Sequence, residues 1–169
     1  KRFLFIVDMG GGKTKIALDL FAYRQHRKEV NRLLVVVPRL VNIGAWAEEI
    51  PLHSNFPHQS VTGSIEQKRH ALTNPTADVV IIDLAGLMLA LTTKEERRDK
   101  KKRIVKKLVI DEVAVAKVAS KFQFVVYDEI HKIKNHDSIH ARIATRLCRL
   151  VECTYGMTGT VFGRSPEEV

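Results

Sequence analysis

The sequence contains little cysteine and no long apolar run. Cys148 and Cys153 are its only cysteines, which excludes a disulfide framework and suits a reducing compartment. No apolar run approaches the ~20 residues that a membrane-spanning helix needs, and the first residues do not resemble a signal peptide. We therefore expect no membrane partner, and a cytoplasmic protein, or a nuclear one if the source is eukaryotic.

Composition also argues against a disordered chain. Of the 169 residues, 45% are hydrophobic, which is enough to build a core, and the length fits one domain. We expect residues 1–169 to form a single lobe. The first residue is Lys1 instead of methionine, and the sequence stops at Val169, where a helix is expected to begin. The chain is therefore expected to be a fragment of a longer protein.

Acidic residues are outnumbered, and the excess of basic residues is uneven. The net charge is +9. Between Lys94 and Lys107, nine Lys/Arg stand against three Asp/Glu, so this stretch carries +6 and the rest of the chain +3. Such a balance is typical of proteins with a polyanion partner such as DNA. The alternative is a solvated face of a helix, and the sequence leaves both interpretations open.

Apolar runs of strand length alternate with helix-like segments. The runs cover residues 3–7, 33–37, 78–83, 124–127 and 153–157. Because they are apolar on both faces, they predict an α/β fold with a mostly parallel sheet and helices on both of its faces. Between residues 94 and 120, near-helical apolar spacing predicts a long helix or a helix pair inserted into this pattern.

A glycine-rich turn follows the first apolar run and precedes a helical pattern. It reads Met9, then Gly10-Gly11-Gly12, then Lys13-Thr14. Backbone N–H groups of such a turn bind phosphates at a helix N-terminus, the lysine adds charge near the outer phosphates, and the threonine hydroxyl ligates magnesium. The usual pattern has a glycine where this chain has Val7. We predict a site for ATP and Mg²⁺, against the alternative of a plain strand-to-helix turn.

A phosphate loop also requires a carboxylate for magnesium and another that orients the attacking water. Three apolar runs end in aspartate, at Asp83, Asp111 and Asp128. No glutamate follows Asp83. The apolar residues before Asp111 continue a helical stripe, although the pair Asp111-Glu112 remains an alternative. Asp128 ends a strand that is bounded on both sides, which makes it the stronger candidate.

The residues after this strand supply the remaining catalytic groups. We predict that Asp128 holds the magnesium ion together with Thr14, and that Glu129 positions or deprotonates the water. His131 is predicted to relay the state of the γ-phosphate to the rest of the lobe. With Lys13, these residues form the predicted catalytic set.

Five segments, in order, resemble the motifs of the first RecA-like lobe of helicase-superfamily-two ATPases, specifically the Swi/Snf-type DNA translocases. The matching segments are residues 8–14 (motif I), 34–38 with Trp46 (motif Ia), 78–82 with Gly86 (motif Ib), 128–135 (motif II, D-E-x-H-x-x-K-N) and 157–160 (motif III). Motif II, with its Lys-Asn ending, is the most specific of them. Val161 departs from the family pattern, which has a proline there.

The resemblance implies a partner lobe and a nucleic acid. In this family ATP binds between two RecA-like lobes, and their closure and release move the protein along DNA. The resemblance implies contacts with the backbone of double-stranded DNA, although ordinary exposed residues remain the alternative. The implied DNA-contacting residues are Arg39, Thr62, Gly63, Lys134 and Arg164, and the implied coupling residues are Thr158, Gly159 and Thr160.

Two functions from different classes follow from these patterns. The first is the ATP-binding lobe of an ATP-dependent DNA translocase or helicase. The second is a nucleotide- or DNA-binding module without effective hydrolysis, which the departures at Val7 and Val161 favour. For the isolated chain we expect weak nucleotide binding and negligible turnover, because the arginine finger of the second lobe contributes roughly 10³–10⁵ in rate in related reactions.

Overall fold

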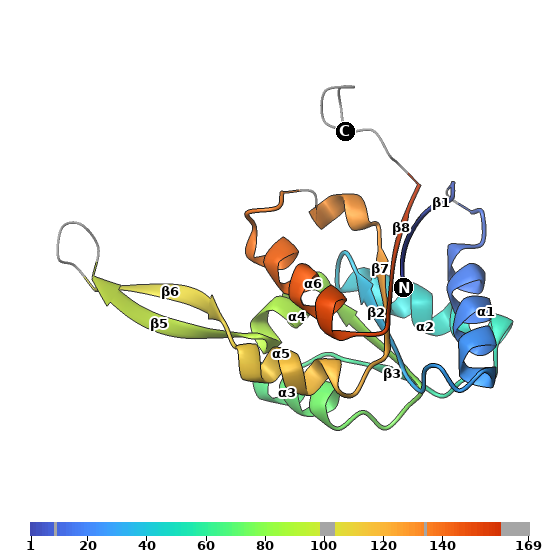
Figure 1. Ribbon diagram of the computed structural model, residues 1–169, viewed down its shortest axis with the longest axis horizontal. Helices are drawn as coiled ribbons and strands as arrows, with labels where there is room; N and C mark the ends of the chain where they lie inside the picture. Colours follow the sequence, from blue (N-terminus) through green and yellow to red (C-terminus); the bar gives the residue numbers. More distant parts are fainter. Residues whose placement is uncertain (9, 99–103, 134, 160–169) are drawn as a thin grey trace.

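A six-stranded parallel sheet forms the centre of the protein, in the order β1-β8-β7-β2-β4-β3 (Figure 1). The structure is a computed structural model that describes residues 1–8, 10–98, 104–133 and 135–159. The strands of this sheet are β1 (Arg2–Ile6), β2 (Leu33–Val37), β3 (His58–Ser60), β4 (Val79–Asp83), β7 (Phe124–Asp128) and β8 (Cys153–Thr158). All neighbouring strands pair in parallel, which confirms the predicted α/β class.

Helices cover both faces of this sheet (Figure 1). They are α1 (Lys13–His26), α2 (Val41–His53), α3 (Ile65–Thr73), α4 (Leu84–Ala90), α5 (Glu112–Ala119) and α6 (Ile139–Leu150), with a 3₁₀ turn η1 (Ile130–Ile133). Among the described residues, no helix combines the length and the apolar character needed to cross a lipid bilayer.

The core consists of two apolar layers, one on each side of the sheet. Alternate residues of β2 point into different layers, as the two-residue period of a strand requires. Leu34 packs with side chains of α3, α4, α5 and α6, whereas Leu33 and Val35 pack with those of α1 and α2. All residues of β2 and β4 are buried, which explains why their sequences are apolar except for Asp83 at the end of β4.

The helical segment predicted for residues 94–120 is wrong in its first part. The structure has an antiparallel hairpin there, formed by β5 (Thr92–Arg98) and β6 (Ile104–Ile110), and among the described residues of this stretch only those of α5 are helical. Cross-strand pairing explains the difference. Glu95 lies opposite Lys107 and Glu96 opposite Lys106, and opposite charges in such positions each contribute roughly 0.2–1 kcal/mol. β6 is also rich in the β-branched residues that favour strands.

The carboxyl ends of the six parallel strands meet at one edge of the sheet. In open α/β sheets, ligands bind outside this edge. The loop after β1 carries the glycine-rich turn, and Asp128 and Thr158 are the last residues of β7 and β8. The topology thus brings the sequence-predicted groups to the same side of the molecule.

Candidate functional site

The glycine-rich turn, which is the predicted phosphate loop, connects β1 to the start of α1. Gly12 is the N-cap residue of α1 and has a φ of +75°, a conformation that costs a residue with a side chain roughly 1 kcal/mol or more. The amide of Gly11 donates to the carbonyl of Asp8 at 3.0 Å. No side chain caps the first turn of α1, so its leading N–H groups stay available to an anion, as a phosphate site requires.

Lys13 reaches from this loop to the end of β7. Its Nζ donates to Oε1 of Glu129 at 2.6 Å, and both side chains are less than a fifth exposed. Strand β8 separates β1 from β7, so the two strand ends are about 10 Å apart, a gap that the two long side chains bridge. Burial opposes ionisation of Glu129, but the hydrogen bond and charge of Lys13 outweigh burial and lower the pKa of this carboxyl.

Glu129 itself has a strained backbone. Its φ is +50°, which is uncommon for a residue other than glycine and costs on the order of 1 kcal/mol or more. Such strain is concentrated at functional sites, where the surrounding contacts hold it in place. Here the contacts with Lys13 hold the carboxylate toward the phosphate loop.

The second oxygen of Glu129 faces His131 and the end of β8. Nδ1 of His131 lies 3.1 Å from Oε2 of Glu129 and 2.9 Å from Oγ1 of Thr158. The hydroxyl of Thr158 also donates to Oε2 of Glu129 at 3.4 Å. The three side chains therefore form a triangle that joins motif II to motif III, and a backbone hydrogen bond from Gly159 to Glu129 also lowers the pKa of the glutamate.

Asp128 carries a buried oxygen that has no hydrogen-bond partner among the described residues, namely Oδ1. Its other oxygen, Oδ2, accepts from Nε1 of Trp46 at 3.1 Å. Burial raises the pKa of Asp128, while the Trp46 hydrogen bond and the charge of Lys13 lower it by less. A bound cation would satisfy the open oxygen, and the nearly buried hydroxyl of Thr14 is an oxygen ligand of the kind that Mg²⁺ prefers. The residues present fit this ion.

The contact between Trp46 and Asp128 was missed by sequence reasoning. Trp46 was recognised only as part of the helix after motif Ia. It reaches Asp128 because β2 and β7 are neighbours in the sheet, so α2 starts beside the end of β7. Nothing in the local spacing of the sequence indicates this pairing.

The other two aspartates considered as magnesium ligands, Asp83 at the end of β4 and Asp111 directly after β6, cap helices. Oδ2 of Asp83 accepts from the amide of Gly86 at 3.2 Å and caps α4. Oδ1 of Asp111 accepts from the amide of Ala114 at 2.9 Å and caps α5. In both cases the carboxylate caps the N-terminus of the helix that follows it by accepting from a backbone amide three residues later.

The residues predicted to contact DNA are only partly placed. Arg39 is exposed in the turn after β2, and Thr62 and Gly63 are exposed in the loop after β3. They lie along the same edge as the phosphate loop, but on the other half of the sheet. Four further residues of the prediction lie outside the described part of the chain: Met9, Lys134, Thr160 and Arg164.

Comparison with known proteins supports the class that this geometry indicates. A family model described as "Type III restriction enzyme, res subunit" matches residues 1–162. A search of curated protein sequences gave no match.

Three solved structures share the fold at low sequence identity. The SWI2/SNF2 ATPase core of Sulfolobus solfataricus, solved in complex with dsDNA, has a TM-score of 0.60 and 20% identity over 94% of this chain. The Hef helicase domain of Pyrococcus furiosus has a TM-score of 0.66 and 18% identity over 99%. The UvsW helicase of bacteriophage T4 has a TM-score of 0.57 and 16% identity over 99%.

The chain spans 27%, 31% and 50% of these three chains, respectively. It therefore corresponds to one part of each. The predicted fold, a RecA-like α/β lobe with a mostly parallel sheet, is confirmed.

Proposed function

The chain belongs to the family of the type III restriction enzyme res subunit, and on that premise we propose that it is the ATP-binding lobe of a DNA translocase or helicase. The observation that carries this proposal is the meeting of Lys13, Glu129 and Thr158 at the carboxyl edge of the sheet. A general base, a phosphate-binding lysine and a residue of motif III within one hydrogen-bonded group suit a lobe that senses and hydrolyses a nucleotide.

Binding of the nucleotide begins at the glycine-rich turn. Its backbone amides and the N-terminus of α1 receive the β-phosphate, and the ammonium group of Lys13 moves to the outer phosphates. That movement breaks the ion pair with Glu129. The carboxylate is then free to accept a hydrogen bond from water, so nucleotide binding itself prepares the base for its role.

Asp128 and Thr14 supply the oxygen ligands for magnesium in this proposal. When bound there, Mg²⁺ neutralises charge on the phosphates during transfer. The hydrogen bond from Trp46 would hold the carboxylate of Asp128 in one orientation. A fixed ligand aligns the phosphates more precisely than a mobile one.

We propose that His131 transmits the structural change caused by phosphate release to the rest of the lobe. Its ring contacts Glu129 on one side and Thr158 on the other. A change in the position of Glu129 therefore alters a hydrogen bond to the last residue of β8. In the complete protein, this change would be transmitted to a C-terminal RecA-like lobe, which would also supply the arginine finger.

DNA is the proposed nucleic-acid partner along which the complete protein would move. Arg39, Thr62 and Gly63 are candidates for contacts with its phosphate backbone, and such contacts weaken as salt increases. Lys134 and Arg164 remain candidates on the basis of the motif resemblance.

Calorimetric titration with MgATP tests the nucleotide site. We expect Lys13→Ala to reduce affinity at least 10-fold, because it removes the charge that faces the outer phosphates. Lys15→Ala is the matched control, since Lys15 lies two positions away, is exposed and forms an ion pair with Asp19 one turn along the same helix. Equal affinities for the Lys13→Ala variant and the wild type would contradict the proposal.

Hydrolysis is tested in the protein that carries both lobes. Double-stranded DNA should stimulate its ATPase activity, and the isolated lobe should bind MgATP with negligible turnover. If the two-lobed protein binds MgATP but shows no DNA-stimulated hydrolysis, a binding module without effective hydrolysis is the correct interpretation.

A further inference from the structure

The hairpin β5–β6 extends away from the body of the lobe on the side of α4 and α5 (Figure 1). Each strand has seven residues, so the hairpin is roughly 24 Å long. The two strands are paired along their full length, from Thr92 opposite Ile110 to Arg98 opposite Ile104. An isolated two-stranded hairpin is only marginally stable. The contacts at its root therefore help to stabilise this hairpin and set the direction in which it leaves the lobe.

The root of the hairpin is fixed to α3 by Arg69. Its Nε donates to the carbonyl of Ala90 at 2.9 Å, and its Nη2 donates to the carbonyl of Thr92 at 2.6 Å. On the opposite strand, the amide of Asp111 donates to the carbonyl of Leu91 at 2.9 Å. These bonds hold both strands at the point where they leave the lobe.

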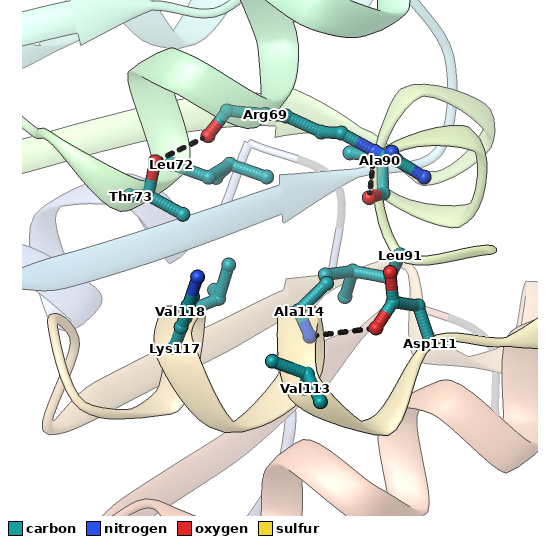
Figure 2. A pocket seen from close by; sticks show the side chains of 10 residues that line it. All are labelled: Arg69, Leu72, Thr73, Ala90, Leu91, Asp111, Val113, Ala114, Lys117 and Val118. Atoms are coloured by element: carbon teal, nitrogen blue, oxygen red, sulfur yellow. Dashed lines mark hydrogen bonds between the residues drawn. The ribbon is translucent and has the colours of Figure 1, made fainter. Parts of the chain in front are cut away.

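Figure 2 shows this root from close by. Arg69 and Asp111 lie on opposite sides of a cavity of about 270 Å³ between α3, α4 and α5. The side chain of Asp111 caps α5 by accepting from the amide of Ala114. The root is thus joined to two helices, and the hairpin is presented in one orientation instead of swinging freely.

Beyond the root, the hairpin is strongly basic. Its two strands contain five Lys/Arg and two Glu, a net charge of +3, and the stretch from residue 94 to 107 carries +6 of the total +9. Lys94, Lys106 and Lys107 are exposed. Lys106 pairs with Glu96 at 3.8 Å, but exposed pairs of this kind are weak, and they leave the excess of positive charge uncompensated.

We propose that this hairpin is a second nucleic-acid contact, which binds the phosphate backbone of duplex DNA at a distance from the carboxyl edge of the sheet. This inference rests on the proposed function as a DNA-dependent lobe. Duplex DNA is favoured as the occupant because a two-stranded ribbon fits its major groove and because its charge complements that of the hairpin. A second contact, remote from the ATP site, gives the lobe a hold on DNA that does not depend on the nucleotide state.

Binding of a labelled duplex at several salt concentrations tests this proposal. The variant Lys106→Gln with Lys107→Gln removes two positive charges and keeps side chains that can hydrogen-bond across the strands. We expect its affinity to fall at least about 10-fold near 0.1 M salt, and the slope of log affinity against log salt to decrease by about 2. The control variant is Lys28→Gln with Lys121→Gln, because both lysines are exposed and outside the hairpin.

A charge-exchange variant separates charge from hairpin stability. Glu95→Lys, Glu96→Lys, Lys106→Glu and Lys107→Glu together reverse the cross-strand pairs but leave the net charge unchanged. We expect this variant to retain DNA affinity within about 3-fold of the wild type, because backbone binding depends mainly on the total charge presented.

Three outcomes would overturn the inference. These are unchanged affinity and salt slope in the Lys106→Gln, Lys107→Gln variant, an equal loss in the control variant, and no DNA binding by the wild-type chain. The first includes the case in which the hairpin binds an acidic protein instead of DNA. MgATP affinity, measured on the same variants, should stay at the wild-type value, so a failure of the hairpin proposal is distinguishable from a failure of the nucleotide site.

Discussion

Lys13 and Glu129 are 116 positions apart in the sequence, yet their side chains meet at 2.6 Å. The pair connects the loop after β1 to the end of β7 across β8, and it holds Glu129 in a backbone conformation with a φ of +50°. In this arrangement the charges of Lys13 and Glu129 neutralise each other. If these are the phosphate-binding and catalytic groups, as we propose, a nucleotide must replace Glu129 as the partner of Lys13, which connects binding to activation of the base.

Replacing the base should separate nucleotide binding from hydrolysis. In Glu129→Gln, the amide no longer holds Lys13 by charge, so we expect MgATP to bind as tightly as in the wild type or a few-fold more tightly. Hydrolysis by the two-lobed protein should fall roughly 10²–10⁴-fold, the usual contribution of a general base. Calorimetry and a steady-state ATPase assay measure the two effects.

The control for this substitution is Glu152→Gln, because Glu152 is exposed on the loop before β8. It should leave both binding and hydrolysis unchanged. A much weaker binding of MgATP by Glu129→Gln would contradict the exchange of partners at Lys13, because it would mean that Glu129 assists the nucleotide instead of competing with it.

The ion pair also predicts how stability depends on pH. The pKa of Glu129 is lower in the folded protein than its ordinary value of 4.5, so the unfolded chain binds more protons in acid. The contribution of Glu129 to the free energy of unfolding is therefore complete above the unfolded pKa and is lost as pH falls through the folded pKa. Urea unfolding should show Glu129→Gln to be less stable than the wild type by on the order of 1 kcal/mol at pH 7.

The same difference should shrink as the pH is lowered below 4.5, because the wild-type carboxyl becomes protonated and resembles the amide. A constant difference between pH 7 and the acid range would show that packing, and not ionisation, is responsible. Asp128 titrates in both proteins and largely cancels in the comparison.

Asp128 is expected to behave in the opposite way. Burial raises its pKa, so its ionised form costs stability near neutral pH, and this cost grows as pH rises toward the folded pKa. Asp128→Asn should therefore increase the free energy of unfolding by on the order of 1 kcal/mol while it weakens the Mg²⁺ dependence of ATP binding. Asp137→Asn is the control, because the side chain of Asp137 is 84% exposed, and it should change neither quantity.

These two measurements on Asp128→Asn should move in opposite directions, which a purely structural role would not produce. If the variant loses stability and keeps full Mg²⁺ dependence, Asp128 is a structural partner of Trp46 and not a metal ligand. Urea unfolding and ATP titrations with and without magnesium distinguish the two roles.

The fold was largely predictable because its central strands are continuous apolar runs up to their last residue. The runs that became β2, β4 and β7 are bounded by turns, and no competing helical pattern fits so short a run. The hairpin was not predictable in the same way. The apolar residues Ile104, Leu108 and Val109 satisfy a helical spacing as well as a strand. Only their cross-strand partners, which lie six to sixteen residues away in the sequence, decide between the two.

The candidate site was predictable to the extent that each group follows its own strand. Residues such as Lys13 and Asp128 can be placed at the carboxyl edge from the parallel topology alone. Their contacts depend on strand order, which one sequence does not reveal. That β8 lies between β1 and β7 decides that Lys13 meets Glu129, and that β2 is next to β7 decides that Trp46 reaches Asp128.

Close packing between β8 and η1 gives the last prediction. A Cβ atom at Gly156 would lie 2.6 Å from Cδ1 and 3.1 Å from Cγ2 of Ile130, so in Gly156→Ala the side chain of Ile130, which belongs to the same turn as His131, must shift. We expect it to reduce the free energy of unfolding by about 1–3 kcal/mol and to reduce hydrolysis by the two-lobed protein. Adding Ile130→Val should restore part of both.

Gly44→Ala is the control, since no atom lies within 4 Å of the added Cβ in α2, and it should stabilise the chain by roughly 0.5–1 kcal/mol. If Gly156→Ala leaves stability and hydrolysis unchanged, η1 moves freely on β8 and does not couple the two motifs.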